Sequence, residues 1–129
     1  MMTDELKTLL KANGFDVTDA YSQTKLTLPG VMWAFNRTIP GNRKKKKQIE
    51  IEVITDAVMD IVDGAEVLNY ESSLAANQTA LQEAFDVLQE LENKFALEIN
   101  DFEHSLGFDR FNRAIMTAFG TVTYQEGGI

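Results

Sequence analysis

The sequence contains no cysteine, and it has only one histidine, two prolines and one tryptophan among 129 residues. The absence of cysteine excludes disulfide bonds, thiolate zinc sites and cysteine nucleophiles. No apolar run approaches the roughly 20 residues that span a bilayer, so we expect no membrane association. The chain begins with the polar, acidic segment 1–5, which does not resemble a signal peptide. We therefore expect the protein to work in a reducing interior.

What the sequence does contain is typical of one soluble domain. Hydrophobic residues make up 44% of the chain and charged residues 25%, and eight phenylalanines and three tyrosines supply apolar area. A chain of this length can bury roughly two thirds of its unfolded surface. No internal repeat or linker divides the sequence, so we expect a single domain over residues 1–129.

Basic residues are few and unevenly placed. The chain has 12 basic and 20 acidic residues, for a net charge of −8. Without one basic run, the rest of the chain has 7 basic and 20 acidic residues, or −13. Such an acidic body is repelled by nucleic acid and by anionic membranes, so any contact with nucleic acid is expected through the run itself. The run consists of Arg43, Lys44, Lys45, Lys46 and Lys47.

In the first half of the chain, hydrophobic periodicity predicts a short helix followed by strands. The helix covers residues 3–13, and strands are expected at 25–28, 31–35 and 48–54. The last of these shows the clearest alternation of apolar and acidic residues. Between two of the strands lies the basic loop, residues 40–48, which we expect to be the tip of a hairpin arm.

The second half is predicted to be helical and then to return to strands. We expect one or two helical turns in 56–62 and a long helix from about 74 to 92, capped by Ser72 or Ser73. A strand at 95–99, a loop or short helix at 101–112, and a strand at 115–124 follow, with Gly120 marking a bulge and residues 125–129 forming a loose tail. The apolar face of the long helix is expected to consist of Leu74, Gln78, Leu81, Phe85, Leu88 and Leu91.

This order of elements predicts an α+β fold. A short N-terminal helix and one long helix are expected to pack on one face of a mainly antiparallel sheet.

His104 is the first candidate for catalysis or metal binding. It follows Asn100, Asp101 and Glu103, and a carboxylate beside a histidine can fix its tautomer and raise its basicity. A single histidine without a second ligand at helical or strand spacing is, however, more typical of a polar loop residue.

Two acidic motifs give equally weak support to an enzyme. Asp56, Asp60 and Asp63 would share one helical face and could bind a divalent cation, although a solvated acidic face is the more common outcome. The segment Glu92-Asn93-Lys94 has a form found in nuclease cores, but it falls at the predicted helix end, where Lys94 complements the helix dipole. We therefore expect no enzymatic activity, metal ion, cofactor or small-molecule substrate.

The basic run is the strongest local signal. Five adjacent cations must be solvated or paired with anions, so the loop is a solvated tip, a non-specific phosphate contact, or a docking element for an acidic partner. The partner can also be a second copy, because a basic arm and an acidic body are complementary. Such a head-to-tail contact closes into a ring if the rotation between copies allows it.

The layout resembles that of phage neck and tail-completion proteins of the tail-terminator type. The similarity lies in the order of elements: a helix at 3–13, a strand that ends in a long loop at 31–47, a strand that enters an acidic linker at 48–56, a helix that runs into a strand at 74–99, and a threonine-rich last strand at 117–124.

This resemblance implies a non-enzymatic α+β subunit of a ring, often a hexamer, through which DNA passes at the head–tail junction. It implies location in the virion, and in the host cytoplasm during assembly, with residues 43–47 contacting a neighbour, another virion protein or DNA. The alternative is a small acidic binding or regulatory protein that contacts an acidic partner or nucleic acid through its lysine-rich loop.

Overall fold

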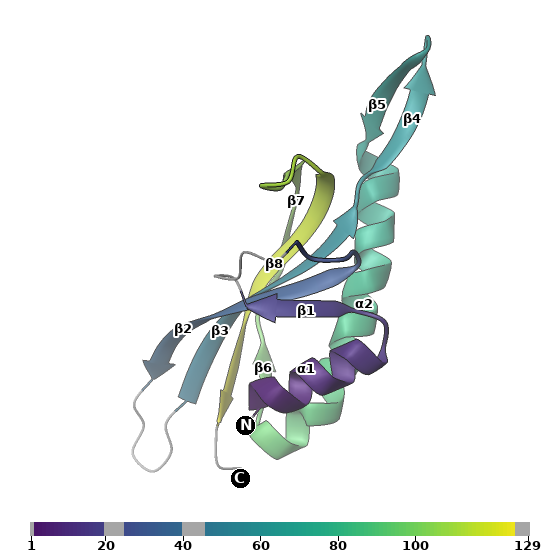
Figure 1. Ribbon diagram of the computed structural model, residues 1–129. Coiled ribbons are helices and arrows are strands. Elements are labelled where there is room, and N and C mark those ends of the chain that lie inside the picture. The colour runs from purple at the N-terminus through teal and green to yellow at the C-terminus, as the bar shows by residue number, and fades with distance from the viewer. Residues whose placement is uncertain (1, 20–24, 40–45, 126–129) are drawn as a thin grey trace.

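The protein has an α+β fold with a sheet covered by helices on one face (Figure 1). The computed structural model describes residues 2–19, 25–39 and 46–125. Helix α1 spans Met2–Ala12, and the long helix α2 spans Tyr70–Phe95. Helix α2 packs across two central strands of the sheet, and α1 packs against α2 and an outer strand. The predicted fold class is confirmed.

The main sheet is antiparallel except at one edge, where its first two strands run parallel. Its last position is shared by two short strands that pair with different parts of the same neighbour. A separate two-stranded hairpin is formed by β4 (Val58–Val62) and β5 (Ala65–Asn69). In spatial order the main sheet contains β1 (Asp16–Asp19), β2 (Gly30–Ile39), β3 (Lys46–Asp56), β8 (Ala114–Gln125), and then β6 (Glu98–Ile99) and β7 (Glu103–Phe108).

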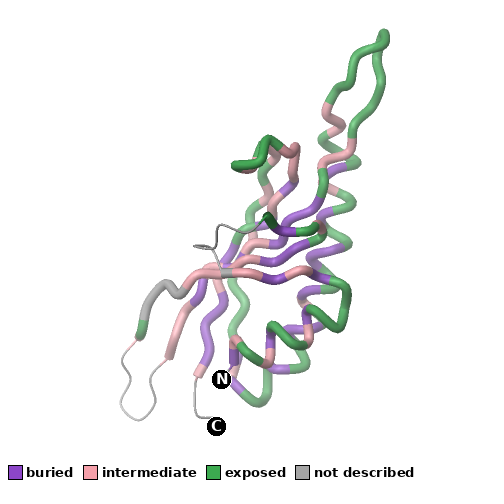
Figure 2. The backbone as a smooth tube through the Cα atoms, in the orientation of Figure 1, coloured by how far each residue is buried: buried purple, intermediate pink, exposed green. Residues whose placement is uncertain are grey.

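The core lies between the sheet and the helices. The alternation predicted for β3 is confirmed, because Ile49, Ile51 and Val53 are each buried, and their partners on β8 face the same way. Figure 2 shows this buried stripe along the sheet centre and the facing sides of both helices. The helical residues that complete this core include Leu6, Leu10, Ala84, Val87, Leu88 and Leu91.

Helix α2 begins four residues earlier than predicted. Asn69 is its N-cap, because its side-chain oxygen accepts a hydrogen bond from the backbone N–H of Ser72 at 3.0 Å. The prediction of a cap at Ser72 or Ser73 was therefore wrong. The predicted apolar face is also displaced at one position, since Gln78 is exposed while its neighbour Asn77 is fully buried.

Three segments have a different secondary structure from the one predicted. Residues 25–28 are not a strand; they form an irregular segment tied to β1 through the Asp16 carboxylate, which accepts from Thr27 N–H. Residues 56–62 are not helical, since β3 ends at Asp56 and β4 begins two residues later. Residues 103–108 form strand β7, where a loop or short helix was expected.

Gly120 does not mark a bulge. The β3–β8 register runs through it without interruption, and the register shift of the sheet lies in β2 between residues 35 and 37. A side chain at Gly120 would instead meet the ring of Phe102, whose nearest atom lies 2.5 Å from the position of a Cβ.

The predicted strand at 95–99 is reduced to Glu98–Ile99 because α2 continues to Phe95. Gln125 belongs to β8, and the rest of the predicted tail lies outside the described residues.

Candidate functional site

The β4–β5 hairpin projects beyond the N-terminal end of α2, away from the sheet (Figure 1). Its turn consists of Asp63 and Gly64, whose φ angles of 51° and 80° are those of a two-residue turn with both residues left-handed. Within the described residues the hairpin pairs with no third strand. At roughly 3.4 Å per residue, its five-residue strands reach roughly 17 Å into solvent.

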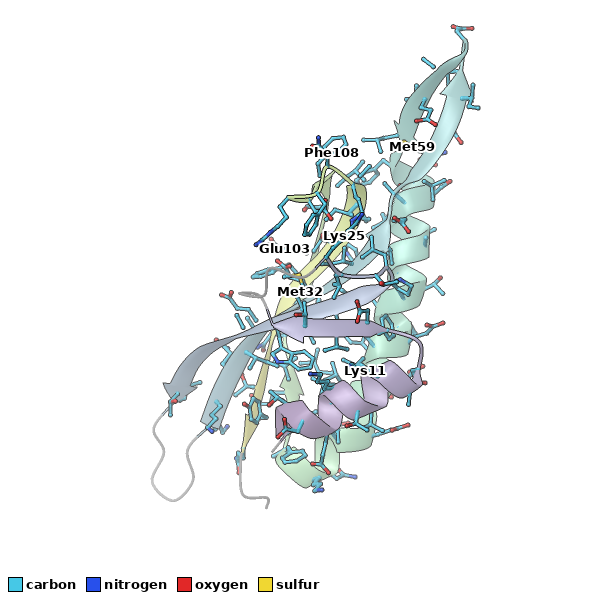
Figure 3. All side chains as sticks on the ribbon, viewed as in Figure 1. Lys11, Lys25, Met32, Met59, Glu103 and Phe108 are labelled. Atoms are coloured by element: carbon cyan, nitrogen blue, oxygen red, sulfur yellow. The ribbon has the colours of Figure 1, made fainter. Side chains whose placement is uncertain are left out.

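Both faces of this hairpin carry exposed apolar side chains. On one face Met59 is 42% exposed and Ile61 77% exposed; on the other, Val62 and Val67 are 52% and 46% exposed. Figure 3 shows Met59 near the base of the hairpin. An isolated two-stranded hairpin is marginally stable in water, and apolar side chains on both faces are typical of strands that are covered on both faces. The hairpin therefore exposes apolar side chains on two faces that no other described element covers.

The base of the hairpin is fastened to the first turn of α2. The backbone N–H of Val58 donates to the hydroxyl of Ser73 at 2.8 Å, and that hydroxyl donates to the carbonyl of Asn69 at 2.7 Å. The Asn69 side-chain amide in turn donates to the Asp60 carboxylate at 2.6 Å. Ser73 is fully buried, so its two bonds are partly shielded from water and hold the base of the hairpin against α2, while the Asn69–Asp60 bond is exposed.

A cleft of about 270 Å³ lies on the open face of the sheet, opposite the helices. The sheet forms its floor, while the segment at residue 26 and the turn at 109–113 form its walls. These two walls are joined, because the Arg113 guanidinium donates to the carbonyl of Leu26 and to the carboxylate of Asp109. The cleft is lined by Thr18, Leu26, Met32, Glu52, Ile54, Asp109, Arg110, Phe111, Arg113, Ile115 and Thr117.

The two carboxylates of the cleft behave differently. Burial, together with the neighbouring Glu50, raises the pKa of Glu52 above its ordinary value. Desolvation also acts to raise the pKa of Asp109, but hydrogen bonds from Arg113 and from the backbone of Phe111 outweigh it and hold that pKa below its ordinary value. Asp109 therefore remains an anion paired with Arg113.

Glu52 predicts a pH dependence of stability. Because its pKa is raised in the folded protein, folding is opposed by ionisation of Glu52, and the free energy of unfolding should rise as the pH falls through the folded pKa towards the ordinary value. Glu52→Gln should remove this contribution and raise the melting temperature slightly at neutral pH. The two proteins should converge near pH 4, which thermal melts between about pH 4 and pH 8 will measure. A difference that does not vary with pH would contradict the assignment.

The structure describes two of the five residues of the basic run. Arg43, Lys44 and Lys45 lie outside the described residues. Lys46 and Lys47 are the first two residues of β3 and not part of a loop, and they pair with Ile39 and Thr38 of β2. The Lys46 ammonium lies 3.6 Å from the Glu98 carboxylate of β6.

The enzyme candidates do not converge on one site in the described structure. His104 lies in β7, and its buried Nε2 has no hydrogen-bond partner among the described residues. The three aspartates expected on one helical face lie instead at the end of β3, in β4 and in the hairpin turn, which corrects that prediction. Lys94 is paired with Glu5 of α1 at 2.5 Å. Residues 2–19, 25–39 and 46–125 contain no group of three or more metal-ligating side chains.

No protein-family model and no curated protein sequence matches the chain. In the part of the chain that the structure describes, no helix is both long and apolar enough to cross a membrane.

Proposed function

We propose that the protein is a structural assembly subunit that binds copies of itself head to tail and closes into a ring. The projecting β4–β5 hairpin carries this proposal, because it exposes apolar side chains on both faces and is fixed in direction by Ser73. Exposed apolar surface of this kind is typical of a protein–protein contact.

The setting that we propose is a phage neck or tail. The resemblance in the order of elements to tail-terminator proteins supports it, as do the α+β fold and a long β2–β3 pair that leads to the basic run. In such a ring, residues 43–47 would contact a neighbouring subunit, another virion protein or the DNA. Electrostatic attraction between this run and the acidic body would steer and orient the contact, while apolar area supplies most of the affinity.

The native mass of the purified protein tests this proposal. Light scattering on a sizing column should show one species of several copies, and raising the salt concentration should weaken it if the basic run takes part. A ring whose mass does not change with salt concentration would indicate that the hairpin, without the basic run, makes the contact. A monomer at every salt and protein concentration would contradict self-assembly and favour the small binding or regulatory protein.

A further inference from the structure

We propose that the β4–β5 hairpin of one copy docks in the open-face cleft of the next copy. This inference rests on the proposed function and names the surface that receives the arm. The occupant is a second copy of this chain, because the hairpin and the cleft match in both apolar character and charge.

The apolar match concerns the side chains at the end of the hairpin. Ile61, Val62 and Val67 need a surface that removes them from water. The cleft offers Leu26, Met32, Ile54, Phe111 and Ile115 in a volume of about 270 Å³. Phe108, 64% exposed, directly precedes the turn that walls the cleft, and Figure 3 shows it at that end of the sheet. The cleft and its margin therefore present apolar surface of the required kind.

The charges of the two surfaces are opposite. Residues 58–69 carry Asp60, Asp63 and Glu66 and contain no basic residue. The margin of the cleft carries Lys25, which lies 5.9 Å from the centre of the Phe111 ring, together with Arg110 and Arg113. Of the cleft's own charged groups, Asp109 and Arg113 are paired with each other, so Lys25 and Arg110 face one remaining carboxylate, that of Glu52. An acidic arm is thus attracted to one of the few basic parts of an acidic body.

Charge also argues against the other large apolar groove. That groove lies between α1 and α2, has a volume of about 340 Å³, and is lined by Asp4, Glu5, Thr8, Leu9 and Leu91. Glu5 is paired with Lys94, but the Asp4 carboxylate would face the carboxylates of the hairpin, and like charges across an interface disfavour the wrong partner. The cleft is therefore the better receptor.

The contact must join different copies. The hairpin extends away from the sheet, and hydrogen bonds at Ser73 hold its base against α2 (Figure 1). It is therefore directed away from the cleft of its own chain. A contact between two different surfaces repeats from copy to copy, which is the geometry that generates rings.

Cysteine cross-linking tests this contact cleanly, because the chain has no native cysteine. One protein carries Ala65→Cys at the end of the hairpin, and a second, size-tagged protein carries Thr117→Cys in the cleft. The matched control replaces the second protein with one carrying Thr8→Cys in the α1–α2 groove. After mixing, a short bismaleimide should join the hairpin to the cleft variant at least about tenfold faster than to the control, because docking holds the two thiols at millimolar effective concentration.

The outcomes separate this inference from the proposed function. Cross-linking that is no faster at Thr117→Cys than at Thr8→Cys, in a mixture that still forms rings by light scattering, overturns the docking site and leaves self-assembly intact. A mixture that stays monomeric overturns both. If Thr117→Cys melts well below the parent protein, Thr18→Cys on the same cleft takes its place in the experiment.

Discussion

Replacing Ile61 and Val67 with aspartate is expected to convert the assembled protein into monomers without unfolding it. The two residues lie on opposite faces of the hairpin and are 77% and 46% exposed in the single chain, so neither supports its core. Burying each in an interface is worth about 1.5–3 kcal/mol. That figure applies to a fully exposed side chain, and these two are only partly exposed before contact, so the double variant should lose about 2–4 kcal/mol per contact, or about 30- to 1000-fold in affinity. Light scattering measures the assembly, and a thermal melt measures the fold.

The control places the same two charges elsewhere on the surface. Ala76→Asp and Gln89→Asp introduce two aspartates at exposed positions of α2, and this variant should assemble like the parent protein. If the Ile61 and Val67 variant keeps the parent mass, the hairpin does not hold the copies together and the proposed function loses its main support.

Asn77→Ala is expected to cause a large loss of stability. The side chain of Asn77 is fully buried, and its amide nitrogen donates to the carbonyls of Val53 and Met116 at 3.1 and 2.9 Å and to the hydroxyl of Thr55 at 3.1 Å. This amide joins α2 to both central strands. Its removal leaves these acceptors without that donor and opens a cavity. It also removes the buried Oδ1 of Asn77, which has no hydrogen-bond partner among the described residues, so the net cost should be about 1–3 kcal/mol. The melting temperature should fall by roughly 4–12 °C.

Asn93→Ala is the matched control for this prediction. Asn93 is exposed in the last turn of the same helix, and its replacement should change the free energy of unfolding by no more than about 0.5 kcal/mol. If Asn77→Ala melts within a degree or two of the parent protein, the buried amide adds no net stability to the link between helix and sheet.

The parts of the fold with strong periodicity were predictable from the sequence. Strand β3 has a strict alternation that matches its buried face, and the long helix and the last strand were placed within a few residues of their observed bounds. Strand β7 was missed because it is an edge strand of largely polar sequence, whose pairing is determined by the length of β8. Asn77 was missed because a polar residue on a helix is normally assigned to the solvent face.

The candidate site was harder to predict than the fold. The first strand of the hairpin was assigned to one or two helical turns, because its apolar residues occur in adjacent pairs, Val58-Met59 and Ile61-Val62, and so hide the period of two. Residues 65–69 were assigned to no element. The one available signal was Asp63-Gly64, since this dipeptide suits a two-residue hairpin turn. The cleft carries no signal in the sequence, because its walls, at residues 26 and 113, are 87 positions apart in the chain.

The buried hydroxyl of Ser73 bears on the number of subunits in a ring. An arm held rigid before contact loses little conformational entropy on docking, so more of its apolar burial is available as affinity. Because the hydroxyl holds the arm against α2, it would, in the proposed ring, also fix the rotation that relates one subunit to the next. The rotation between neighbours decides whether a head-to-tail series closes and after how many copies. A single serine at the start of a helix would thus help to set the circumference of the assembly.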